Sequence, residues 1–242
     1  MEVKSTAIVI GAGGGLGSAL CKQWQQDDGI DTVIAISRES ANNNTLPGIR
    51  YIPCDYSEPA IAETCNQLKT LSGQITRVCI CNGVLHNDRV WPEKRLEDIS
   101  LDTLQEVFKV NSYIPILWLK ALLPLVKGDR DCVITVFSAR VGSIGDNRSG
   151  GWYSYRASKA ALNMLLKTAA IEYARRASKV KLIAFQPGTV DTALSKPFQQ
   201  GVKPGKIFTA EFVAQRLVDI MNEQKVDGEL SFIDWENSKI AW

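Results

Sequence analysis

The 242-residue sequence has a single histidine, His86, and its six cysteines include no C-x-x-C pair. Cys79 and Cys81 lie two residues apart in an apolar run, so in a strand both side chains would point to the same face, which does not suit tetrahedral metal ligation. Cysteine is among the residue types most often buried as a free thiol. We therefore expect buried free thiols, no metal site and no redox role for the cysteines.

The sequence also lacks an excess of one charge and any long hydrophobic run. Lysine and arginine number 28 against 26 aspartates and glutamates, so we expect no nucleic-acid partner and no membrane partner. No stretch approaches the roughly 20 apolar residues of a membrane helix. The short apolar run near the start is ended by glycines and does not fit a signal peptide. We expect a cytoplasmic protein with a small-molecule partner.

Short apolar runs alternate with helical patterns along the chain. Seven strands are predicted, at Ala7–Ile10, Thr32–Ile36, Arg50–Pro53, Arg77–Cys81, Cys132–Phe137, Val180–Phe185 and Leu230–Ile233. Helices are predicted between them, from about residue 16, over 59–71, over 101–125, from 152 onward and over 210–223. Alternation with continuously apolar strands predicts a single-domain, Rossmann-like doubly wound α/β fold, with a mostly parallel seven-stranded sheet and helices on both faces.

A glycine cluster follows the first predicted strand. Gly11, Gly15 and Gly17 have the spacing G-x-x-x-G-x-G, which differs from G-x-G-x-x-G and from a P-loop. Glycine permits a turn with positive φ and lets a pyrophosphate approach the amides at the start of the next helix. A merely flexible turn is the alternative. The preceding strand and the following amphipathic helix favour phosphate binding at Gly11, Gly15, Leu16 and Gly17.

The end of the second predicted strand is where a dinucleotide-binding fold selects its cofactor. The sequence there is Ser37-Arg38-Glu39. Arg38 can make a bidentate contact with a 2′-phosphate and Ser37 can add a hydrogen bond, so NADP(H) is preferred. Glu39 keeps NAD(H) possible, and an arginine in a loop is often only solvated. Asp55, after the third strand, either accepts a hydrogen bond from adenine or caps the next helix.

The second informative segment is Tyr155-Arg-Ala-Ser-Lys159. On a helix Lys159 lies four residues after Tyr155 and shares its face, whereas it lies six residues after Tyr153 and is turned away. A nearby ammonium favours phenolate, so Lys159 would lower the tyrosine pKa from its ordinary value of about 10. Tyr155 would then serve as a general acid/base. The alternative is an ordinary pair on an exposed helix, because Tyr-x-x-x-Lys occurs often by chance.

Ser138 favours the catalytic interpretation, and Asn111 is a further polar candidate with two open interpretations. Ser138 ends the fifth predicted strand at the edge where open α/β sheets bind ligands, and its hydroxyl could donate to a carbonyl oxygen or simply start a loop. Asn111 is an amide within an apolar helical pattern. It either holds a helix bend beside Pro115 or relays a water molecule to Lys159. Within the same pattern, Pro115 and Pro124 predict a bend and a helix terminus.

On these residues the chain resembles the short-chain dehydrogenase/reductase family over nearly its whole length. The family's glycine motif falls on Gly11, Gly15 and Gly17, and its catalytic tetrad on Asn111, Ser138, Tyr155 and Lys159. Its Asn-Asn-Ala-Gly and Pro-Gly motifs fall on Ile80-Cys81-Asn82-Gly83 and on Pro187-Gly188-Thr189-Val190-Asp191-Thr192. The stretch SARVGSIGDNRSGGWYSYRASKAALN and the ending around FIDWE resemble the C-factor-like branch, some of whose members are associated with signalling.

The chain also departs from the family pattern. Ile10 replaces a threonine, and the fourth-strand motif loses its first asparagine and its alanine, which could change how the adenine side is held. The gap of 17 residues between Ser138 and Tyr155 is longer than is common. The loop Arg140–Gly151 would therefore shape the substrate mouth.

The resemblance implies hydride transfer between nicotinamide and a carbonyl or alcohol substrate. Ser138 and Tyr155 would hold the carbonyl oxygen, Tyr155 would give its proton, and Lys159 with Asn111 would restore it through water. Cofactor contacts are implied for Asn82, Gly83, Tyr155, Lys159, Pro187, Gly188, Val190 and Thr192. The alternative is a cofactor-binding signalling or sensor protein of the same fold with little or no turnover.

The resemblance also carries expectations about the substrate and the assembly. The segment Leu194–Phe208, which bears Phe198, would cover a hydrophobic substrate. His86 and Trp91 either edge the pocket or simply pack in a loop. Apolar helical stretches over 104–125 and 160–173 lead us to expect a homodimer or homotetramer.

Overall fold

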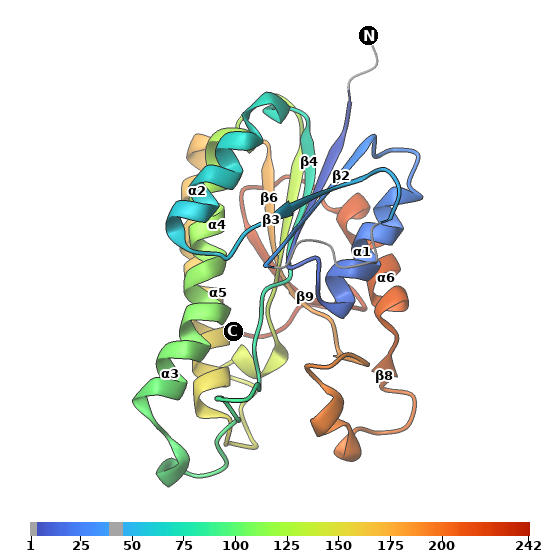
Figure 1. Cartoon of the computed structure of the whole chain (residues 1–242). Helices are drawn as coiled ribbons and strands as arrows, with labels where there is room; N and C mark the ends of the chain where they lie inside the picture. The colour runs from blue at the N-terminus through green and yellow to red at the C-terminus, as the bar shows by residue number, and fades with distance from the viewer. Residues whose placement is uncertain (1–3, 39–45) are drawn as a thin grey trace.

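A parallel seven-stranded sheet forms the centre of the computed structural model, which describes residues 4–38 and 46–242 (Figure 1). The strand order is β3-β2-β1-β4-β5-β6-β9, and every neighbouring pair is parallel. The strands are β1 (Thr6–Ile10), β2 (Thr32–Ser37), β3 (Ile49–Pro53), β4 (Ile75–Ile80), β5 (Cys132–Phe137), β6 (Val180–Gln186) and β9 (Leu230–Asp234). The predicted fold is confirmed.

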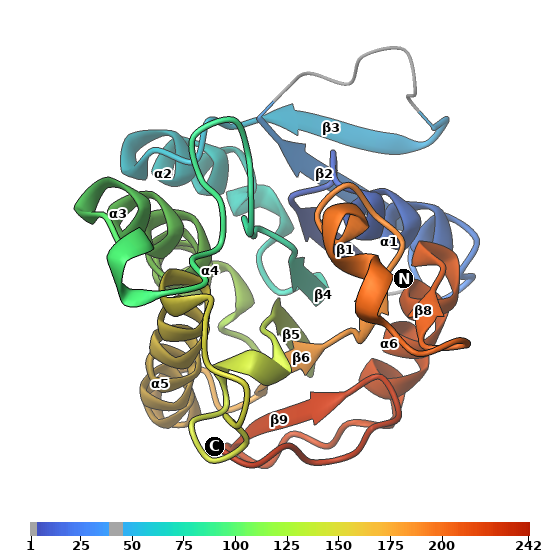
Figure 2. The ribbon, with the colours of Figure 1, turned by 90° about the horizontal axis from the view of Figure 1, so that it is seen from below.

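Helices cover both faces of this sheet (Figure 2). One face carries α1 (Gly15–Gln25) and α6 (Ala210–Glu223), and the other carries α2 (Glu58–Gln67), α4 (Ile114–Val126) and α5 (Tyr153–Arg176). Trp24 lies in the core of the first face and Trp118 in the core of the second, both fully buried. Because both faces are covered, the central strands β1 and β5 are buried along their whole length and mostly apolar.

The order of the strands reverses between β1 and β4. The chain runs outward from β1 through β2 to β3 and then returns to the other side of β1 with β4. Open α/β sheets bind ligands at the carboxyl ends of the strands at such a reversal. Gly11 follows β1 and Asn82 follows β4, so both lie at this point.

The helix predicted over 101–125 is interrupted in the structure. It consists of α3 (Leu101–Phe108), a π-helical turn at Lys109–Tyr113 and α4. Pro115 lies at the start of α4, as a bend would require, but Pro124 lies inside α4 and does not end it. The helix predicted to reach Leu71 ends at Gln67, and a 3₁₀ turn (Lys69–Leu71) follows. Cys81 lies just beyond β4.

Two short strands outside the main sheet were not predicted. β7 (Thr189–Val190) and β8 (Ile207–Phe208) pair in parallel, so the chain between them, with a 3₁₀ helix at Lys196–Gly201, forms a closed excursion at the carboxyl edge of the main sheet (Figure 1). We call residues 191–206 the covering segment. The predicted cover, Leu194–Phe208, falls on this segment and on β8, and its contact with a substrate stays a prediction.

The cysteines, as described in the structure, are free and mostly buried, and burial raises the pKa of Cys21 to about 12. Within residues 4–38 and 46–242, no group of three or more His, Cys, Asp or Glu side chains is placed to hold a metal ion. Over the same ranges, no helix combines the length and the apolar character needed to cross a bilayer.

Candidate active site and cofactor cleft

The turn after β1 depends on the small size of its glycines. Gly11 has a φ of +86°, which L side chains rarely adopt, and a Cβ on Gly17 would lie 2.3 Å from the Gly11 carbonyl oxygen. The next helix, α1, begins without a capping side chain and without an acidic residue in its first turn. Its first amides are therefore free of side-chain acceptors and suit an anionic ligand.

A cavity of about 720 Å³ opens beside this turn. Six of the predicted cofactor-binding residues line it: Gly11, Ser37, Arg38, Asp55, Asn82 and Gly83. Gly13, Gly14 and Ser18 line it too and were missed by the sequence reasoning. Gly15, Leu16 and Gly17 do not line the cavity. Gly17 instead permits the close approach to the Gly11 carbonyl described above.

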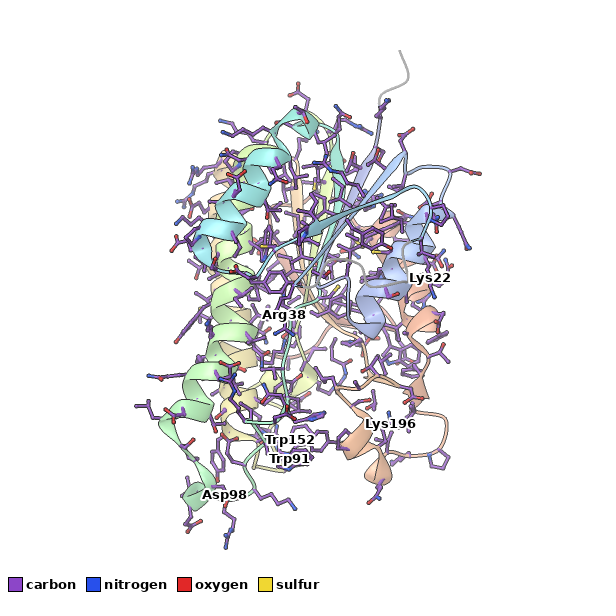
Figure 3. All side chains as sticks on the ribbon, viewed as in Figure 1. Lys22, Arg38, Trp91, Asp98, Trp152 and Lys196 are labelled. Carbon is purple, nitrogen blue, oxygen red and sulfur yellow. The ribbon has the colours of Figure 1, made fainter. Side chains whose placement is uncertain are left out.

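Cofactor selection was predicted from residues at the end of β2. Arg38 is exposed directly after this strand (Figure 3), and Ser37 is its last residue. Glu39 lies outside the described residues. Asp55 accepts a hydrogen bond from the Ser57 backbone N–H at 2.8 Å, and its hydrogen bonds with Ser57 lower the pKa of this carboxyl. The cap of α2 is Ser57, whose hydroxyl accepts from the Ala60 N–H, so the predicted capping by Asp55 is wrong and Asp55 instead stabilises the turn before the helix. Asp55 also lines the cavity, and its contact with adenine stays a prediction.

The Pro-Gly segment lies beside the glycine turn. Gly188 has a φ of +76°, and a Cβ there would lie 2.8 Å from the Phe208 ring. Val190 is buried, and Thr192 lies so close to Gly15 that a Cβ on Gly15 would be 2.8 Å from its methyl group. Neither these residues nor Pro187 lines the cavity, whereas the following Ala193 and Leu194 do. The segment thus connects the start of α1 to the covering segment.

Tyr155 stands in the first turn of α5, whose start is held by an unusual arrangement. Trp152, the residue before the helix, has a φ of +53°, a strained conformation for a bulky side chain. The buried carboxylate of Glu93 accepts hydrogen bonds from the backbone N–H of Ser154, at 3.1 Å, and from its hydroxyl. A carboxylate at a helix N-terminus is favoured by the helix dipole. Glu93 therefore fixes the helix end that carries Tyr155.

Lys159 is 2% exposed, and its Nζ donates to the carbonyl oxygen of Phe137 at 2.8 Å. Nζ lies 6.0 Å from the centroid of the Tyr155 ring. Burial lowers the pKa of Lys159 to about 7 and raises the pKa of Tyr155 to about 12. The predicted lowering of the Tyr155 pKa by Lys159 is therefore wrong for this structure, because desolvation penalises both charged forms. Tyr155 is held in its protonated form.

Asn111 lies in the π-helical turn and is fully buried. Its amide donates to the Val84 carbonyl at 2.9 Å and to the Ser158 hydroxyl at 3.1 Å, and accepts from the Val84 N–H at 2.8 Å. A Cβ built on Gly83 would lie 3.7 Å from Asn111 Oδ1 and 3.9 Å from Lys159 Nζ. Asn111 thus ties the loop after β4 to α5 and lies with Lys159 behind Gly83. Gly83 lines the cavity, whereas the four predicted catalytic residues, Asn111, Ser138, Tyr155 and Lys159, do not. π-turns are frequent at functional sites.

Ser138 follows β5 directly and is 5% exposed. Its backbone N–H donates to the Phe185 carbonyl at 2.8 Å, and its hydroxyl donates to Oδ1 of Asn163 at 2.6 Å. Asn163 lies on α5, one turn after Lys159. Ser138 is therefore joined to the helix of Tyr155 by a side-chain hydrogen bond.

Four rings meet on the side of Tyr155 that faces the covering segment. His86 and Trp91 come from the loop after β4, Trp152 precedes α5, and Phe198 belongs to the covering segment. We call these four residues the aromatic cluster. Figure 3 labels Trp91 and Trp152 toward one end of the molecule, and the rings of both contact Phe198. The Trp152 ring centroid lies 6.1 Å from that of Tyr155, so the cluster adjoins the proposed reactive phenol.

Residues 5–203 match the family described as short chain dehydrogenase. The chain belongs to the short-chain dehydrogenase family. A curated member, the 1-hydroxy-2-glutathionyl-2-methyl-3-butene dehydrogenase of Rhodococcus sp. (strain AD45), is 29% identical over 198 residues, which cover 80% of this chain and 81% of the relative. The C-signal of Myxococcus xanthus is 25% identical over 147 residues, 61% of this chain and 83% of C-signal. This match supports the predicted likeness to the C-factor-like branch.

The architecture of this short-chain dehydrogenase is shared with solved structures. The NADPH-bound carbonyl reductase from chicken fatty liver aligns over 100% of both chains with a TM-score of 0.84 at 22% identity. At this identity the likeness concerns the fold.

Sequence reasoning on this short-chain dehydrogenase missed Glu93, Trp152, Phe198's ring contacts and Asn163. Glu93 lies 61 residues before its partner Ser154, so no local pattern announces the contact. Asn163 could have been found, because it lies four residues after Lys159 and eight after Tyr155 on one helix.

Proposed function

We propose that the chain is an NADP(H)-dependent oxidoreductase that transfers a hydride between nicotinamide and a carbonyl or alcohol substrate, with Tyr155 as general acid/base. The observation that carries the proposal is a buried lysine that lies directly behind a glycine of the cavity lining. Lys159 lies one helical turn from Tyr155 and against Gly83, which lines that cavity. Family membership supports the same reaction class.

The residues present fit a dinucleotide. The uncapped start of α1 and the turn at Gly11–Gly14 would hold the pyrophosphate, with Asp55 and Asn82 at the adenine side. Arg38 and Ser37 would bind a 2′-phosphate. NADPH, when bound, supplies a hydride to the carbonyl carbon and is oxidised to NADP⁺. The NADPH-bound state of the chicken carbonyl reductase supports this choice of cofactor, and NAD(H) stays as the weaker alternative.

Side chains of the protein would supply the proton that the carbonyl oxygen needs during reduction. As the carbonyl π electrons move onto oxygen, Tyr155 donates its phenolic proton there, and Ser138 donates a hydrogen bond to the same oxygen. A pKa of about 12 keeps Tyr155 protonated at neutral pH, which suits carbonyl reduction. The Lys159 ammonium has three donors, of which one binds the Phe137 carbonyl, so two are left for ribose hydroxyls.

The test is NADPH oxidation with a panel of ketones and aldehydes, in the parent and in Tyr155→Phe. The matched control is Tyr153→Phe, which removes the hydroxyl of the neighbouring tyrosine. We expect Tyr155→Phe to lower kcat/KM about 100-fold or more and Tyr153→Phe to leave it within a factor of about two. Equal activity of the parent and Tyr155→Phe would reject the proposed role.

The second candidate is a cofactor-binding signalling protein with little turnover, which the likeness to C-signal favours. The same variant separates the two. A biological role that persists unchanged in Tyr155→Phe, with NADPH still bound, would support the signalling candidate.

Cofactor preference is tested at Arg38. Reversal of its charge in Arg38→Asp removes the charge-assisted contact with a 2′-phosphate and should lower kcat/KM for NADPH roughly 10-fold or more, with the value for NADH unchanged or raised. Lys22→Asp is the control, because Lys22 is exposed on α1 outside the cavity lining (Figure 3). Equal losses for both cofactors in Arg38→Asp would contradict NADP(H) selection by this residue.

We also propose that the enzyme works in the cytoplasm as a homodimer or homotetramer. Large apolar side chains are exposed on the helices of the second face, among them Tyr113, Met164 and Ile171. Such a surface favours association of copies. The native mass measured by light scattering would be two or four times 26.7 kDa.

A further inference from the structure

The aromatic cluster is arranged around the ring of Phe198. Its centroid lies 5.5 Å from that of His86, 5.3 Å from Trp91 and 5.2 Å from Trp152. The angles between Phe198 and its neighbours run from 46° to 69°, within the tilted and edge-to-face arrangements that aromatic pairs prefer. The place that the Phe198 ring occupies is therefore surrounded by three aromatic rings and suits an aromatic group.

Three of these rings belong to segments packed on the main sheet and its helices, whereas Phe198 belongs to the covering segment. His86 also bonds through Nε2 to the Ala193 carbonyl oxygen at 3.0 Å, which ties the cluster to that segment. A substrate that enters between the two parts must separate Phe198 from its neighbours. The substrate would then replace the contacts that the Phe198 ring makes with its aromatic neighbours.

Two observations distinguish the cluster from ordinary core packing. Trp91 is 53% exposed, although a tryptophan that serves only the core is largely buried, as Trp24 and Trp118 are. Trp152 occupies the left-handed region, where bulky residues are outliers that persist mainly at functional sites. The cluster also begins at the phenol, since the Trp152 and Tyr155 rings are 6.1 Å apart.

We propose that the substrate is an aryl carbonyl compound, whose ring binds Trp91 and Trp152 while its carbonyl lies at Tyr155. The inference rests on the proposed function and names its substrate class. An aromatic ring attached to the carbonyl carbon would lie one ring away from the phenol, where the cluster begins. A saturated ring with the same number of carbons has at least as much apolar area but lacks the quadrupole that favours these contacts.

The experiment compares an aryl ketone with its cyclohexyl counterpart, by kcat/KM, in three proteins. The parent should prefer the aryl ketone, and Trp91→Leu should lose roughly 2- to 12-fold of that preference, mainly through KM. The control is Trp242→Leu, because Trp242 is 51% exposed, as Trp91 is, but packs on Phe232 away from the cluster. Trp242→Leu should keep the preference.

The outcomes separate the substrate class from the reaction. Equal kcat/KM for both ketones in the parent would overturn the aryl inference, and so would an equal loss for both in Trp91→Leu. Reduction of either ketone would still support the proposed function. If neither ketone nor any aldehyde is reduced, and Tyr155→Phe matches the parent, the proposed function itself fails.

An independent observation concerns the amide of Asn163. It is 4% exposed, its Oδ1 accepts the proton of Ser138 at 2.6 Å, and its Nδ2 has no hydrogen-bond partner in the part of the chain that the structure describes. A serine hydroxyl has one proton. While that proton is given to Asn163, Ser138 cannot donate it to a substrate oxygen.

Rotation of the amide by 180° exchanges its two ends. The NH₂ group would then donate to the Ser138 oxygen, which gives the unpartnered donor a partner and frees the serine proton. The amide oxygen would lose its partner, and a buried carbonyl oxygen tolerates this better than a buried N–H does. The hydrogen bonds of the buried amide therefore favour the orientation in which Asn163 donates to Ser138 and the serine proton points to the site.

We infer that Asn163 is a positioning residue, which directs the Ser138 hydroxyl at the substrate oxygen when its amide is rotated. Asn163→Asp tests this, because aspartate has the same shape but offers only acceptors and keeps the serine proton. We expect kcat to fall roughly 10-fold or more with little change in KM, since the lost hydrogen bond strengthens in the transition state.

The decisive measurement is a double-mutant cycle. In a Ser138→Ala background, Asn163→Asp should cause no further loss of kcat. An equal loss in both backgrounds, or no loss in the parent, would overturn the inference. If Asn163→Asp does not fold, as judged by circular dichroism and NADPH binding, Asn163→Leu in the same cycle decides between the same two outcomes.

Discussion

Two lysines, Lys159 and Lys181, are almost completely buried, and they differ in their binding partners and in their place in the sheet. Lys181, near the start of β6, is 1% exposed, and its ammonium binds both carboxylate oxygens of Asp227 at 2.7 and 2.8 Å and the Glu229 carbonyl at 3.0 Å. Lys159 is 2% exposed and binds one carbonyl, that of Phe137 at the end of β5. The two residues therefore lie at opposite ends of the parallel strands.

The difference shows how a buried charge is handled for stability and for function. Lys181 has its carboxylate within the chain, so its charge is compensated on folding. For Lys159 no carboxylate lies within ion-pair distance among the described residues, and burial lowers its pKa to about 7. The amino edge of the sheet thus supplies a counter-charge for its buried lysine, whereas the carboxyl edge supplies Lys159 with only a neutral carbonyl among the described residues.

The largest expected effect is on activity. Lys159→Met removes the ammonium beside Tyr155, and we expect kcat/KM for carbonyl reduction to fall roughly 100-fold or more, because neither proton return nor ribose binding is then supported. The folded state should not be weakened, since a buried amine without a carboxylate partner is replaced by an apolar chain. Parallel assays and thermal unfolding check both halves. A loss of activity that merely follows unfolding would contradict the comparison.

The second prediction concerns the pH dependence of stability. The folded pKa of Lys159 lies below its unfolded value, so between about pH 7 and 10 the unfolded chain binds one more proton at this residue. The free energy of unfolding should therefore rise with pH in this window. Relative to Lys159→Met, we expect the parent to gain on the order of 2 kcal/mol between pH 7 and 9. Tyr155, with a pKa of about 12, stays neutral throughout.

Urea unfolding of both proteins at several pH values measures this difference. If the free energy of unfolding changes with pH by the same amount in the parent and in Lys159→Met, Lys159 is not the source of the pH dependence. Comparison of the two proteins removes the contribution of every other titrating group that they share.

The same contrast explains what the sequence could predict. The strand, the glycine turn and the helix with Tyr155 and Lys159 depend on neighbours within a few residues, so apolar runs and glycine spacing sufficed for them. The burial of Lys159 and the partial burial of Tyr155 depend on the whole fold. The expected effect of the ammonium on the Tyr155 pKa was therefore wrong, since spacing alone gave no information on desolvation.

Long-range contacts account for the other omissions. Asn111 is held by Val84 and Ser158, 27 and 47 residues away, and these contacts accompany a π-turn that no local pattern indicated. The place of Asn111 in the π-turn just before Pro115 agrees with the interpretation that it holds a helix bend, and the relay of water to Lys159 stays a prediction. Phe198 meets three rings from two other segments, which its own surroundings in the sequence do not reveal.

The smallest expected effect is at the opposite edge. Lys181→Met leaves Asp227 without its cation, and we expect the free energy of unfolding to fall by about 1–3 kcal/mol. The loss stays in this range because the Asp227 side chain is 50% exposed and water can solvate it. Activity per folded molecule should be unchanged, since Lys181 is far along the strand from the site. The two single variants would then separate the roles of the lysines. Lys159→Met lowers turnover, whereas Lys181→Met lowers the free energy of unfolding. A Lys181→Met protein that is fully stable but inactive would show that the two edges are coupled, because only a change transmitted along β6 could then reach the carboxyl end.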